Sequence, residues 1–280
     1  MKTSSFQNHV VIVTGASSGI GKALALQLSK EGACLSLAAR NPERLGNLAQ
    51  ECHDLGGQAI PVPTDVAEQA QCQRLIEATI QQFGRIDMLV NNAGFSLVGK
   101  FEQLPSLELF QQVMEVNFNG VVQCTYYALP YLKDTGGSIV NVSSLGGKLA
   151  IPYNTSYIAS KFAVTGFSDS LRMELRNEGV SVTVIYPYWV VTEFHERMLD
   201  KNGQARGPGG RAIYTEKMMT AEQCAEIVIK AAKRRQREVV MGPGTIATWL
   251  KLIAPSLMDK IIIERFLKPM VKRSTQADQH

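Results

Sequence analysis

Tyr157 and Lys161 are a pair of side chains whose types and spacing could move a proton. Residues at positions i and i+4 share one face of a helix. A lysine ammonium beside a phenol stabilises the phenolate, so it would lower the tyrosine pKa from its free value of about 10. Tyr157 is therefore a candidate general acid–base near neutral pH. Taken alone, the spacing is common by chance, and a solvated surface pair is the simpler explanation.

A glycine-rich segment near the N-terminus could bind phosphate. It reads Thr14-Gly15-Ala16-Ser17-Ser18-Gly19-Ile20-Gly21, follows an apolar run and precedes a helical pattern. Glycines let the backbone approach a pyrophosphate, and a helix N-terminus supplies oriented N–H donors. The spacing is GxxxGxG rather than GxGxxG, and a plain turn would also explain it. The strand–turn–helix context favours a dinucleotide, with contacts from Gly15, Ser17, Ser18, Gly19, Ile20 and Gly21.

The residue after the second predicted strand bears on which dinucleotide binds. An acidic residue usually holds the ribose of NAD at this point, but residues 35–39 contain no acid and Arg40 follows them. A guanidinium can pair with a 2′-phosphate. Arg40 therefore predicts NADP(H) in preference to NAD(H), the alternative being a solvated loop cation.

Composition narrows the class of protein. The chain has 280 residues, of which 45% are hydrophobic and 19% charged, with a net charge of +4. This mixture excludes disordered, collagen-like and coiled-coil proteins, and the small basic excess does not predict nucleic-acid binding. The five cysteines and four histidines are scattered, so no disulfide framework or metal site is expected. The apolar run at 10–13 is too short for a signal peptide or membrane span, and no long apolar stretch follows. We therefore expect a soluble, reduced, cytoplasmic protein.

The elements that must position these residues alternate along the chain. Strands are predicted at 10–14, 34–39, 59–62, 86–91, 138–143, 180–186 and 239–241, and helices at 20–30, 42–52, 67–83, 106–132, 156–177 and 221–235. Strands that are apolar on both faces suit a parallel sheet. The alternation predicts an α/β, doubly wound, Rossmann-like parallel sheet in a single domain, with a core over about 8–242. Ligands of such sheets lie beyond the carboxyl ends of the strands.

Taken together and in order, the motifs resemble the short-chain dehydrogenase/reductase family. They are Gly15–Gly21, Asn91-Asn92-Ala93-Gly94, Asn117, Ser144 and Tyr157–Lys161, and the resemblance covers residues 10 to about 241. It implies that Tyr157 donates a proton in reduction and accepts one in oxidation, and that Ser144, rather than Ser143, hydrogen-bonds the substrate carbonyl. It implies that Lys161 holds the nicotinamide ribose and lowers the Tyr157 pKa. Asn117 would anchor a water that relays protons to Lys161.

The resemblance also implies the remaining cofactor contacts. Asp65 and Val66 would meet the adenine, Asn92 the ribose side, and Val190 and Thr192 the nicotinamide carboxamide. Ala93, Gly94 and Pro187 are further expected cofactor contacts. Two positions depart from the family pattern. Tyr188 stands after Pro187 where glycine is common, so the backbone beside the nicotinamide is expected to differ. Ser18 stands before Gly19 where many NADP-dependent relatives carry lysine or arginine, so selection of the phosphate rests on Arg40.

These features predict an NADP(H)-dependent oxidoreductase that interconverts a carbonyl and a secondary alcohol. A loop at about 188–219 would close over a lipophilic substrate, with Tyr153, Trp189, Phe194 and Met198 in contact with it and Phe95 and Leu97 nearby. The glycines within 201–211 predict a mobile segment in that loop. Equally, the loop's aromatic and Met side chains could pack on the body of the fold. The alternative function is a non-catalytic NADP(H)-binding scaffold or sensor, against which the intact Asn117, Ser144, Tyr157 and Lys161 argue.

The C-terminal extension, at about 244–273, is predicted to be a basic, apolar-rich helix over 246–271 that breaks at Pro255. It could lie on an anionic membrane surface, cover the substrate pocket or form a subunit interface. The basic cluster at 233–237 has no interleaved aromatic residues, so we interpret it as a solvated helix end rather than a nucleic-acid site. The family resemblance implies a homodimer or homotetramer assembled through the helices at 106–132 and 156–177.

Overall fold

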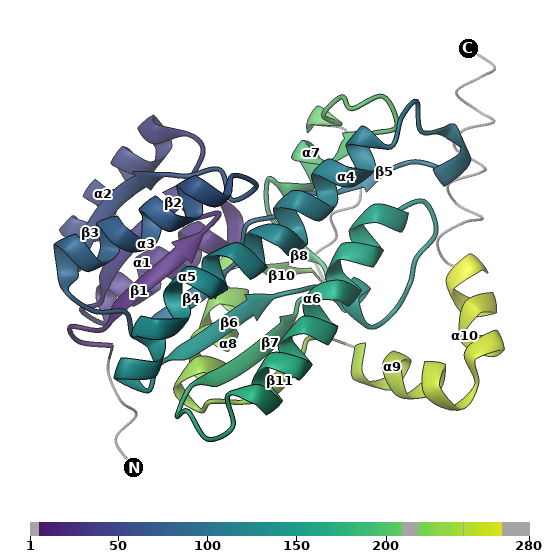
Figure 1. Ribbon diagram of the computed structural model, residues 1–280. Helices are drawn as coiled ribbons and strands as arrows, with labels where there is room; N and C mark the ends of the chain where they lie inside the picture. The colour runs from purple at the N-terminus through teal and green to yellow at the C-terminus, as the bar shows by residue number, and fades with distance from the viewer. Residues whose placement is uncertain (1–5, 209–217, 243, 265–280) are drawn as a thin grey trace.

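The computed structural model describes residues 6–208, 218–242 and 244–264. Its centre is a seven-stranded parallel sheet with strand order β11-β7-β6-β4-β1-β2-β3 (Figure 1). The strands are β1 (Val10–Thr14), β2 (Cys34–Ala39), β3 (Gln58–Pro63), β4 (Met88–Asn91), β6 (Ser138–Val142), β7 (Ser181–Tyr186) and β11 (Glu238–Val240). The prediction of a doubly wound, Rossmann-like sheet is confirmed. The chain returns from the edge strand β3 to β4 beside β1, which places a topological switch point at the carboxyl ends of β1 and β4.

Helices cover both faces of the sheet, as the two-sided apolar strands require. Helices α1 (Gly19–Lys30), α2 (Pro42–Asp54) and α8 (Ala221–Lys233) form one core with the sheet. Helices α3 (Gln69–Phe83), α5 (Gly120–Thr135) and α6 (Thr155–Glu174) form the other. Successive residues of β1 alternate between these cores: Val11 and Val13 belong to the first and Ile12 to the second. All three side chains are fully buried.

The long helix predicted over 106–132 is interrupted. It consists of α4 (Glu108–Met114), a π-helical turn at Glu115–Asn119 and then α5. A π turn inside a helix is uncommon and is frequent at functional sites. Here it contains the buried residue Asn117. The helical region predicted at 106–132 is thus helical, and the π turn at its centre is a feature that the sequence did not predict.

The segment predicted to cover the substrate, at about 188–219, is held by two short strand pairings outside the central sheet. Strand β8 (Val190–Val191) pairs with β10 (Met219–Thr220), and β9 (Leu199–Asp200) pairs with β5 (Leu97–Val98). The short helix α7 (Phe194–Arg197) lies between β8 and β9. Residues 209–217, which include part of the predicted glycine-rich segment, lie outside the described residues.

The C-terminal extension forms two helices, α9 (Gly244–Ile253) and α10 (Pro255–Ile262). The predicted break at Pro255 is confirmed. The inner faces of both helices pack on residues that follow β6, in an apolar cluster of Ala247, Leu250, Met258, Ile262, Leu145, Leu149 and Ile151. Residues 265–271 of the predicted helix lie outside the described residues. In the described chain, no helix has the length and apolar character that crossing a membrane requires.

Candidate active site

A cavity of about 1300 Å³ opens at the carboxyl ends of β1, β2, β4, β6 and β7. Most of the predicted cofactor residues line it: Gly15, Ser17, Ser18, Gly19, Ile20, Arg40, Asp65, Val66, Asn92, Ala93, Gly94, Pro187, Val190 and Thr192. Ser144, Tyr157 and Lys161 line the same cavity. The predicted phosphate loop and the predicted proton donor therefore face one space, although Gly15 and Tyr157 are far apart in the sequence.

The glycine-rich loop packs so closely on its neighbours that a Cβ at Gly15, Gly19 or Gly21 would crowd other atoms of the protein. Gly15 and Gly19 have left-handed backbones, with φ of 65° and 53°, which glycine adopts without the steric cost of a Cβ. A Cβ on Gly21 would lie 2.3 Å from the carbonyl oxygen of Gly15. Gly21 does not line the cavity, so its role is to let α1 pack beneath the loop. This close backbone cradle at a helix N-terminus fits a dinucleotide pyrophosphate.

Asn92 braces the loop from β4. Its side-chain amide donates to the carbonyl oxygens of Thr14 and Gly15, at 3.0 and 3.3 Å. The Thr14 hydroxyl in turn accepts from the backbone N–H groups of Asn92 and Ala93. Asn92 lines the cavity, and its side-chain N–H groups are hydrogen-bonded to the protein. It therefore positions the phosphate loop, in addition to its predicted contact with the ribose.

Two predicted contacts follow β2 and β3. Arg40 lines the cavity and is exposed, and within the described part of the chain its side chain makes no hydrogen bond or ion pair. Asp65 accepts from the backbone N–H of Ala67 and so shapes the turn after β3. Val66 is buried and packs against Gly120 at the start of α5. The guanidinium of Arg40 is thus available to an anion, whereas Asp65 and Val66 are held by the fold.

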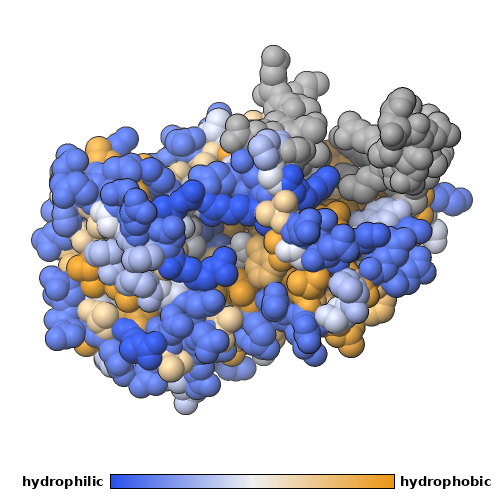
Figure 2. Space-filling model, turned by 90° about the horizontal axis from the view of Figure 1, so that it is seen from above, coloured by the Kyte–Doolittle hydropathy of each residue, from blue (hydrophilic) through white to orange (hydrophobic). Residues whose placement is uncertain are grey.

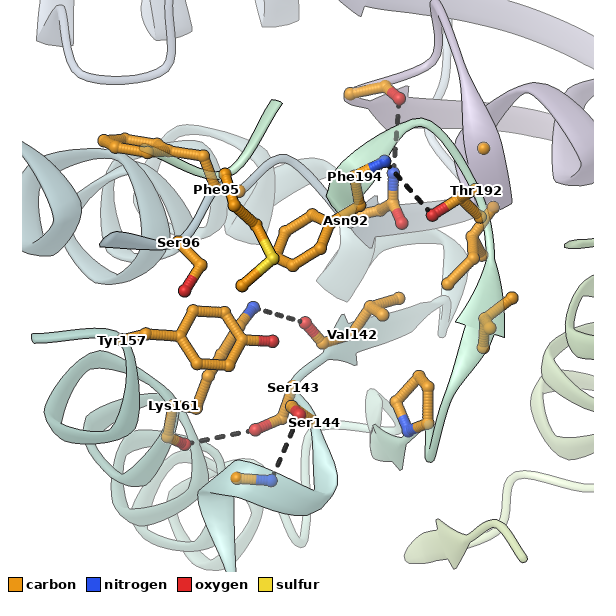
Figure 3. A pocket seen from close by; sticks show the side chains of 18 of the residues that line it. Asn92, Phe95, Ser96, Val142, Ser143, Ser144, Tyr157, Lys161, Thr192 and Phe194 are labelled. Atoms are coloured by element: carbon orange, nitrogen blue, oxygen red, sulfur yellow. Dashed lines mark hydrogen bonds between the residues drawn. The ribbon is translucent and has the colours of Figure 1, made fainter. Parts of the chain in front are cut away.

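Ser144, Tyr157 and Lys161 converge on the cavity from the end of β6 and from α6 (Figure 3). The Ser144 hydroxyl accepts from the Gly146 N–H at 3.0 Å, which fixes the side chain at the start of a short helical turn. Its neighbour Ser143 is turned away from this role, since its hydroxyl donates to the Lys161 carbonyl oxygen at 3.1 Å. Lys161 is buried and donates to the Val142 carbonyl oxygen at 3.0 Å.

Burial shifts the pKa values of Tyr157 and Lys161 in opposite directions and favours the neutral form of each side chain. Burial raises the pKa of Tyr157 to about 12, and a hydrogen bond with Ser144 opposes the rise. Burial lowers the pKa of Lys161 to about 8. The prediction that the Lys161 ammonium lowers the Tyr157 pKa is therefore wrong. The Lys161 ammonium lies 5.7 Å from the centroid of the Tyr157 ring and is directed at the Val142 carbonyl, so desolvation of the phenol prevails.

Asn117 lies behind the cavity wall rather than in it. Its side-chain oxygen accepts from the Phe95 N–H at 3.0 Å, and its amide donates to the Phe95 carbonyl oxygen and to the Ser160 hydroxyl. A Cβ on Gly94 would lie 3.0 Å from the Asn117 side-chain oxygen and 3.6 Å from Lys161 Nζ. The side chain thus ties the segment after β4 to α6 next to Lys161. Its predicted role as the anchor of a water stays a prediction.

The far end of the cavity is apolar. Phe95, Trp189, Phe194 and Met198 line it, together with residues of α9 and α10 that the sequence did not assign to the site, among them Ile246, Ala247, Leu250, Met258 and Ile262. The Phe194 ring lies 5.9 Å from the Tyr157 ring. Of the predicted pocket residues, Leu97 and Tyr153 lie outside the lining. The Tyr153 backbone forms a left-handed turn with φ of 66°, and its carbonyl oxygen accepts from the Gly99 N–H.

His195 is a cavity residue that the sequence motifs did not indicate. Its ring is buried and stacks on Trp189 with the ring centroids 5.4 Å apart. Burial, and secondly the charge of Arg206, lower the pKa of His195 to about 4. The imidazole is consequently neutral near pH 7 and contributes to the wall as an aromatic ring. Stacking between residues six positions apart in a loop leaves no periodic signal in the sequence.

Tyr188 does not strain the backbone after β7. The described non-glycine residues with positive φ are Asn8, Tyr153 and Arg235, so Tyr188 needs none of glycine's conformational freedom. The ring is accommodated by Gly242, where a Cβ would lie 3.2 Å from Tyr188 Cβ. The expected disturbance near Val190 and Thr192 is thus not seen in the backbone conformation of Tyr188.

Comparisons with known proteins agree with this geometry. The sequence model of the family described as short chain dehydrogenase matches residues 9–203. The chain is 34% identical over 260 residues to "11-beta-hydroxysteroid dehydrogenase A" of Sesamum indicum, covering 89% of this chain and 73% of the relative. It is 33% identical over 279 residues to "Dehydrogenase/reductase SDR family protein 7-like" of Dictyostelium discoideum, covering 96% of this chain and 85% of the relative.

Two solved structures are also similar. One is a short-chain dehydrogenase/reductase from Burkholderia phymatum in complex with NAD, with a TM-score of 0.80, 26% identity, and coverage of 91% of this chain and 96% of the other. The second is an alcohol dehydrogenase from the archaeon Thermococcus sibiricus complexed with 5-hydroxy-NADP, with a TM-score of 0.72 and 28% identity. That match covers 84% of this chain and 96% of the other.

Proposed function

The chain belongs to the short-chain dehydrogenase/reductase family, and from this premise we propose that it is an NADP(H)-dependent oxidoreductase. It would interconvert a carbonyl and a secondary alcohol on a lipophilic substrate, with Tyr157 as general acid–base. The observation that carries the proposal is that a glycine cradle, an available Arg40 guanidinium and the Ser144–Tyr157–Lys161 group line one cavity. The solved relatives include complexes with NAD and with 5-hydroxy-NADP, and the sequence-based argument for NADP(H) rests on Arg40.

The protein groups have distinct roles in this reaction. NADP(H), when bound, supplies or accepts the hydride. Tyr157 gives its proton to the substrate oxygen during reduction and takes it back during oxidation. The Ser144 hydroxyl hydrogen-bonds that oxygen and stabilises the charge that develops there. Lys161 stabilises the phenolate through its charge, since its ammonium lies 5.7 Å from the ring centroid.

The cavity walls support the lipophilic part of the proposal. Phe95, Trp189, Phe194 and Met198 face the inner faces of α9 and α10 across the end of the cavity that Tyr157 borders. Apolar and aromatic walls with few polar groups bind ligands by burying their apolar surface. The similar dehydrogenases from plants are named for hydroxysteroids, and a compact polycyclic ketone is a suitable first member of a substrate panel.

The test is NADPH consumption with a panel of ketones, comparing the parent with Tyr157→Phe. We expect the variant to lose activity by about 10²–10⁴-fold, the usual contribution of a general acid–base, while its affinity for NADPH is retained. Tyr126→Phe is the matched control, because Tyr126 is exposed on α5 and does not line the cavity. Consumption that persists unchanged in Tyr157→Phe would refute the assigned mechanism, whereas a parent protein that binds NADPH but consumes none with any ketone would favour the NADP(H)-binding scaffold.

The outer face of the C-terminal extension supports a second proposal, peripheral contact with a lipid surface. Ile246, Trp249, Leu252 and Ile253 of α9 have exposed fractions of 76, 63, 75 and 80%. Figure 2 shows apolar side chains among polar ones on the side that carries α9 and α10, to the right in that view. Ile246 also lines the cavity, so the apolar surface continues into the predicted substrate site. A lipophilic substrate could enter along this face.

The extension at 244–273 has a basic excess, with six Lys and Arg residues against two Asp and Glu residues. Lys251 donates to the Lys148 carbonyl oxygen and lies over the Phe162 ring. We expect sedimentation to be stronger with anionic vesicles than with neutral ones, and to be lost in Trp249→Glu/Ile253→Glu. Equal recovery of parent and variant with both kinds of vesicle would contradict lipid contact. The predicted cytoplasmic location stays a prediction.

Assembly through α5 and α6 is the third part of the proposal. Helix α6 exposes Phe162 and Met173, with Met173 70% exposed. Such side chains suit an interface between two copies. Light scattering at micromolar concentration is expected to give the mass of a homodimer or homotetramer, and Met173→Glu is expected to lower it. The mass of a single chain for the parent would contradict this proposal.

A further inference from the structure

Arg197 brings a guanidinium to the position where the glycine-rich motif lacks a cation. Ser18 stands directly before Gly19, and Arg197 Nη1 donates to the Ser18 hydroxyl at 2.9 Å. Arg197 is the last residue of α7, 179 positions further along the chain. Both residues line the cavity. A cation therefore stands beside Ser18 in space although none is present there in the sequence.

Glu193 joins this arginine to a second one. Its carboxylate oxygen Oε2 accepts from Arg44 Nη1 at 3.0 Å and also pairs with Arg197 Nη2. Arg44 comes from α2, four residues after Arg40, and both line the cavity. Burial opposes ionisation of Glu193, but the Arg44 hydrogen bond and the charges of Arg197 and Arg44 hold its pKa below the usual value. The Glu193 carboxylate thus pairs with the guanidinium groups of Arg44 and Arg197, and Arg40 adds a third positive charge to this part of the cavity.

The cluster is accessible to a ligand. The side chains of Arg44, Arg197 and Glu193 are 49, 43 and 47% exposed. Ion pairs with this exposure contribute only about 0–1 kcal/mol each, and Glu193 engages one nitrogen of each guanidinium, so other N–H groups of both can turn to an incoming dianion. Guanidinium forks match the oxygens of a phosphate monoester, and such charge-assisted bonds are stronger than neutral ones.

We propose that Arg197 and Arg44, together with Arg40, recognise the 2′-phosphate of NADP(H), and that Glu193 holds the two guanidiniums in place as their counter-ion. The proposal rests on the proposed function, since it takes the dinucleotide to lie on the glycine-rich loop. It adds a consequence for the substrate site. Arg197 and Phe194 belong to the same short helix, and Phe194 packs against Tyr157 at 5.9 Å. Contact with the phosphate therefore fixes the helix that forms the wall beside the proton donor.

Calorimetric titration with two nucleotides tests the proposal without turnover. Adenosine 2′,5′-bisphosphate carries the 2′-phosphate, and adenosine 5′-monophosphate lacks it. We expect Arg197→Gln and Arg44→Gln each to weaken binding of the bisphosphate by about tenfold or more, from loss of a charge-assisted contact, and to leave binding of the monophosphate nearly unchanged. Arg197→Lys should retain part of the affinity, because it keeps the charge but loses the fork. Arg206→Gln is the control, since Arg206 lies in the same loop outside the cavity lining.

The outcomes separate this proposal from the proposed function. Equal weakening for both nucleotides, or no weakening in Arg197→Gln, overturns the role of Arg197 in reading the phosphate. If Arg40 variants alone discriminate between the two nucleotides, the proposed function stands and the three-arginine site falls. A parent protein that binds neither nucleotide overturns both. Selective loss of the bisphosphate in Arg197→Gln and Arg44→Gln, with Arg206→Gln unchanged, supports the site.

Discussion

The Lys161 ammonium lies 5.7 Å from the centroid of the Tyr157 ring and donates its hydrogen bond to the Val142 carbonyl oxygen at 3.0 Å. The two side chains thus line one cavity, with the ammonium near the phenol ring and its hydrogen bond directed to the backbone. Burial favours the neutral form of each, with the Tyr157 pKa at about 12 and the Lys161 pKa at about 8. The Tyr157 phenol is consequently protonated near pH 7, and formation of the phenolate requires stabilisation by positive charge in the cavity.

The pH dependence of stability should reveal the buried ammonium. The Lys161 pKa falls from 10.5 to about 8 on folding, so between these values the unfolded chain binds more protons than the folded one. Stability therefore rises with pH in this window, by about 2 kcal/mol between about pH 7 and about pH 9.5. The raised Tyr157 pKa acts in the opposite direction: above pH 10, its ordinary value, the folded chain binds more protons than the unfolded one, so stability falls as the pH rises.

Urea unfolding of the parent, Lys161→Met and Lys230→Met at the two pH values measures this effect. Lys230 is exposed on α8 and serves as the matched control. The free energy of unfolding of the parent should rise relative to Lys161→Met as the pH increases, whereas Lys230→Met should follow the parent. Parallel pH profiles for the parent and Lys161→Met would show that the ammonium is well solvated.

Charge reversal at Arg40 should change cofactor choice. Arg40→Asp places a carboxylate where the 2′-phosphate is expected, so NADPH affinity should fall by about ten- to a hundredfold while NADH affinity changes little. Arg74→Asp, on the exposed surface of α3, controls for the change in net charge. Fluorescence titration with both cofactors gives the ratio, and parallel losses for NADPH and NADH would show that Arg40 does not read the phosphate.

Much of the fold was predictable because each strand carries its own signal. Val11, Ile12 and Val13 are apolar on both faces, which in a short run predicts a buried parallel strand. The π turn was not predictable, since the helical pattern continues through Glu115–Asn119 and the close contact of Gly120 with Val66 is made between distant parts of the chain. Sequence periodicity reports which face is buried, not where a helix widens by one residue.

The candidate site divides in the same way. Tyr157 and Lys161 share a helix, so their spacing was visible, and Ser144 was assigned by the family resemblance. Arg197 and Ser18 meet only because β8 and α7 fold back over the phosphate loop, and no local pattern predicts that contact. The shift of the Tyr157 pKa was predicted with the wrong sign, because a neighbouring charge is visible in sequence whereas the loss of hydration depends on the closed cavity wall.

The two adjacent serines after β6 should behave differently when mutated. Ser144→Ala removes the hydroxyl that we propose hydrogen-bonds the substrate oxygen, and should lower kcat by about 10²–10³-fold. Ser143→Ala removes the bond to the Lys161 carbonyl oxygen, so it should cost about 1–3 kcal/mol of stability with a much smaller effect on kcat. Steady-state kinetics and thermal unfolding of both variants decide the assignment, and the opposite pattern would make Ser143 the substrate contact.

Two glycine-to-alanine substitutions should separate the cofactor cradle from ordinary helix propensity. In Gly21→Ala the new Cβ would lie 2.3 Å from the Gly15 carbonyl oxygen and 2.7 Å from the Asn92 amide nitrogen, so the phosphate loop must move. We expect stability to fall by about 1–3 kcal/mol, and NADPH binding to weaken as the loop loses its shape.

Gly46→Ala is the matched control. Gly46 lies in α2, and a Cβ added there would meet no atom within 4 Å, so alanine should stabilise that helix by about 0.5–1 kcal/mol. Thermal unfolding and calorimetric titration of both variants provide the comparison. A Gly21→Ala protein that binds NADPH as tightly as the parent would show that the cradle does not set the path of the pyrophosphate, because the loop cannot keep its present backbone around that methyl group.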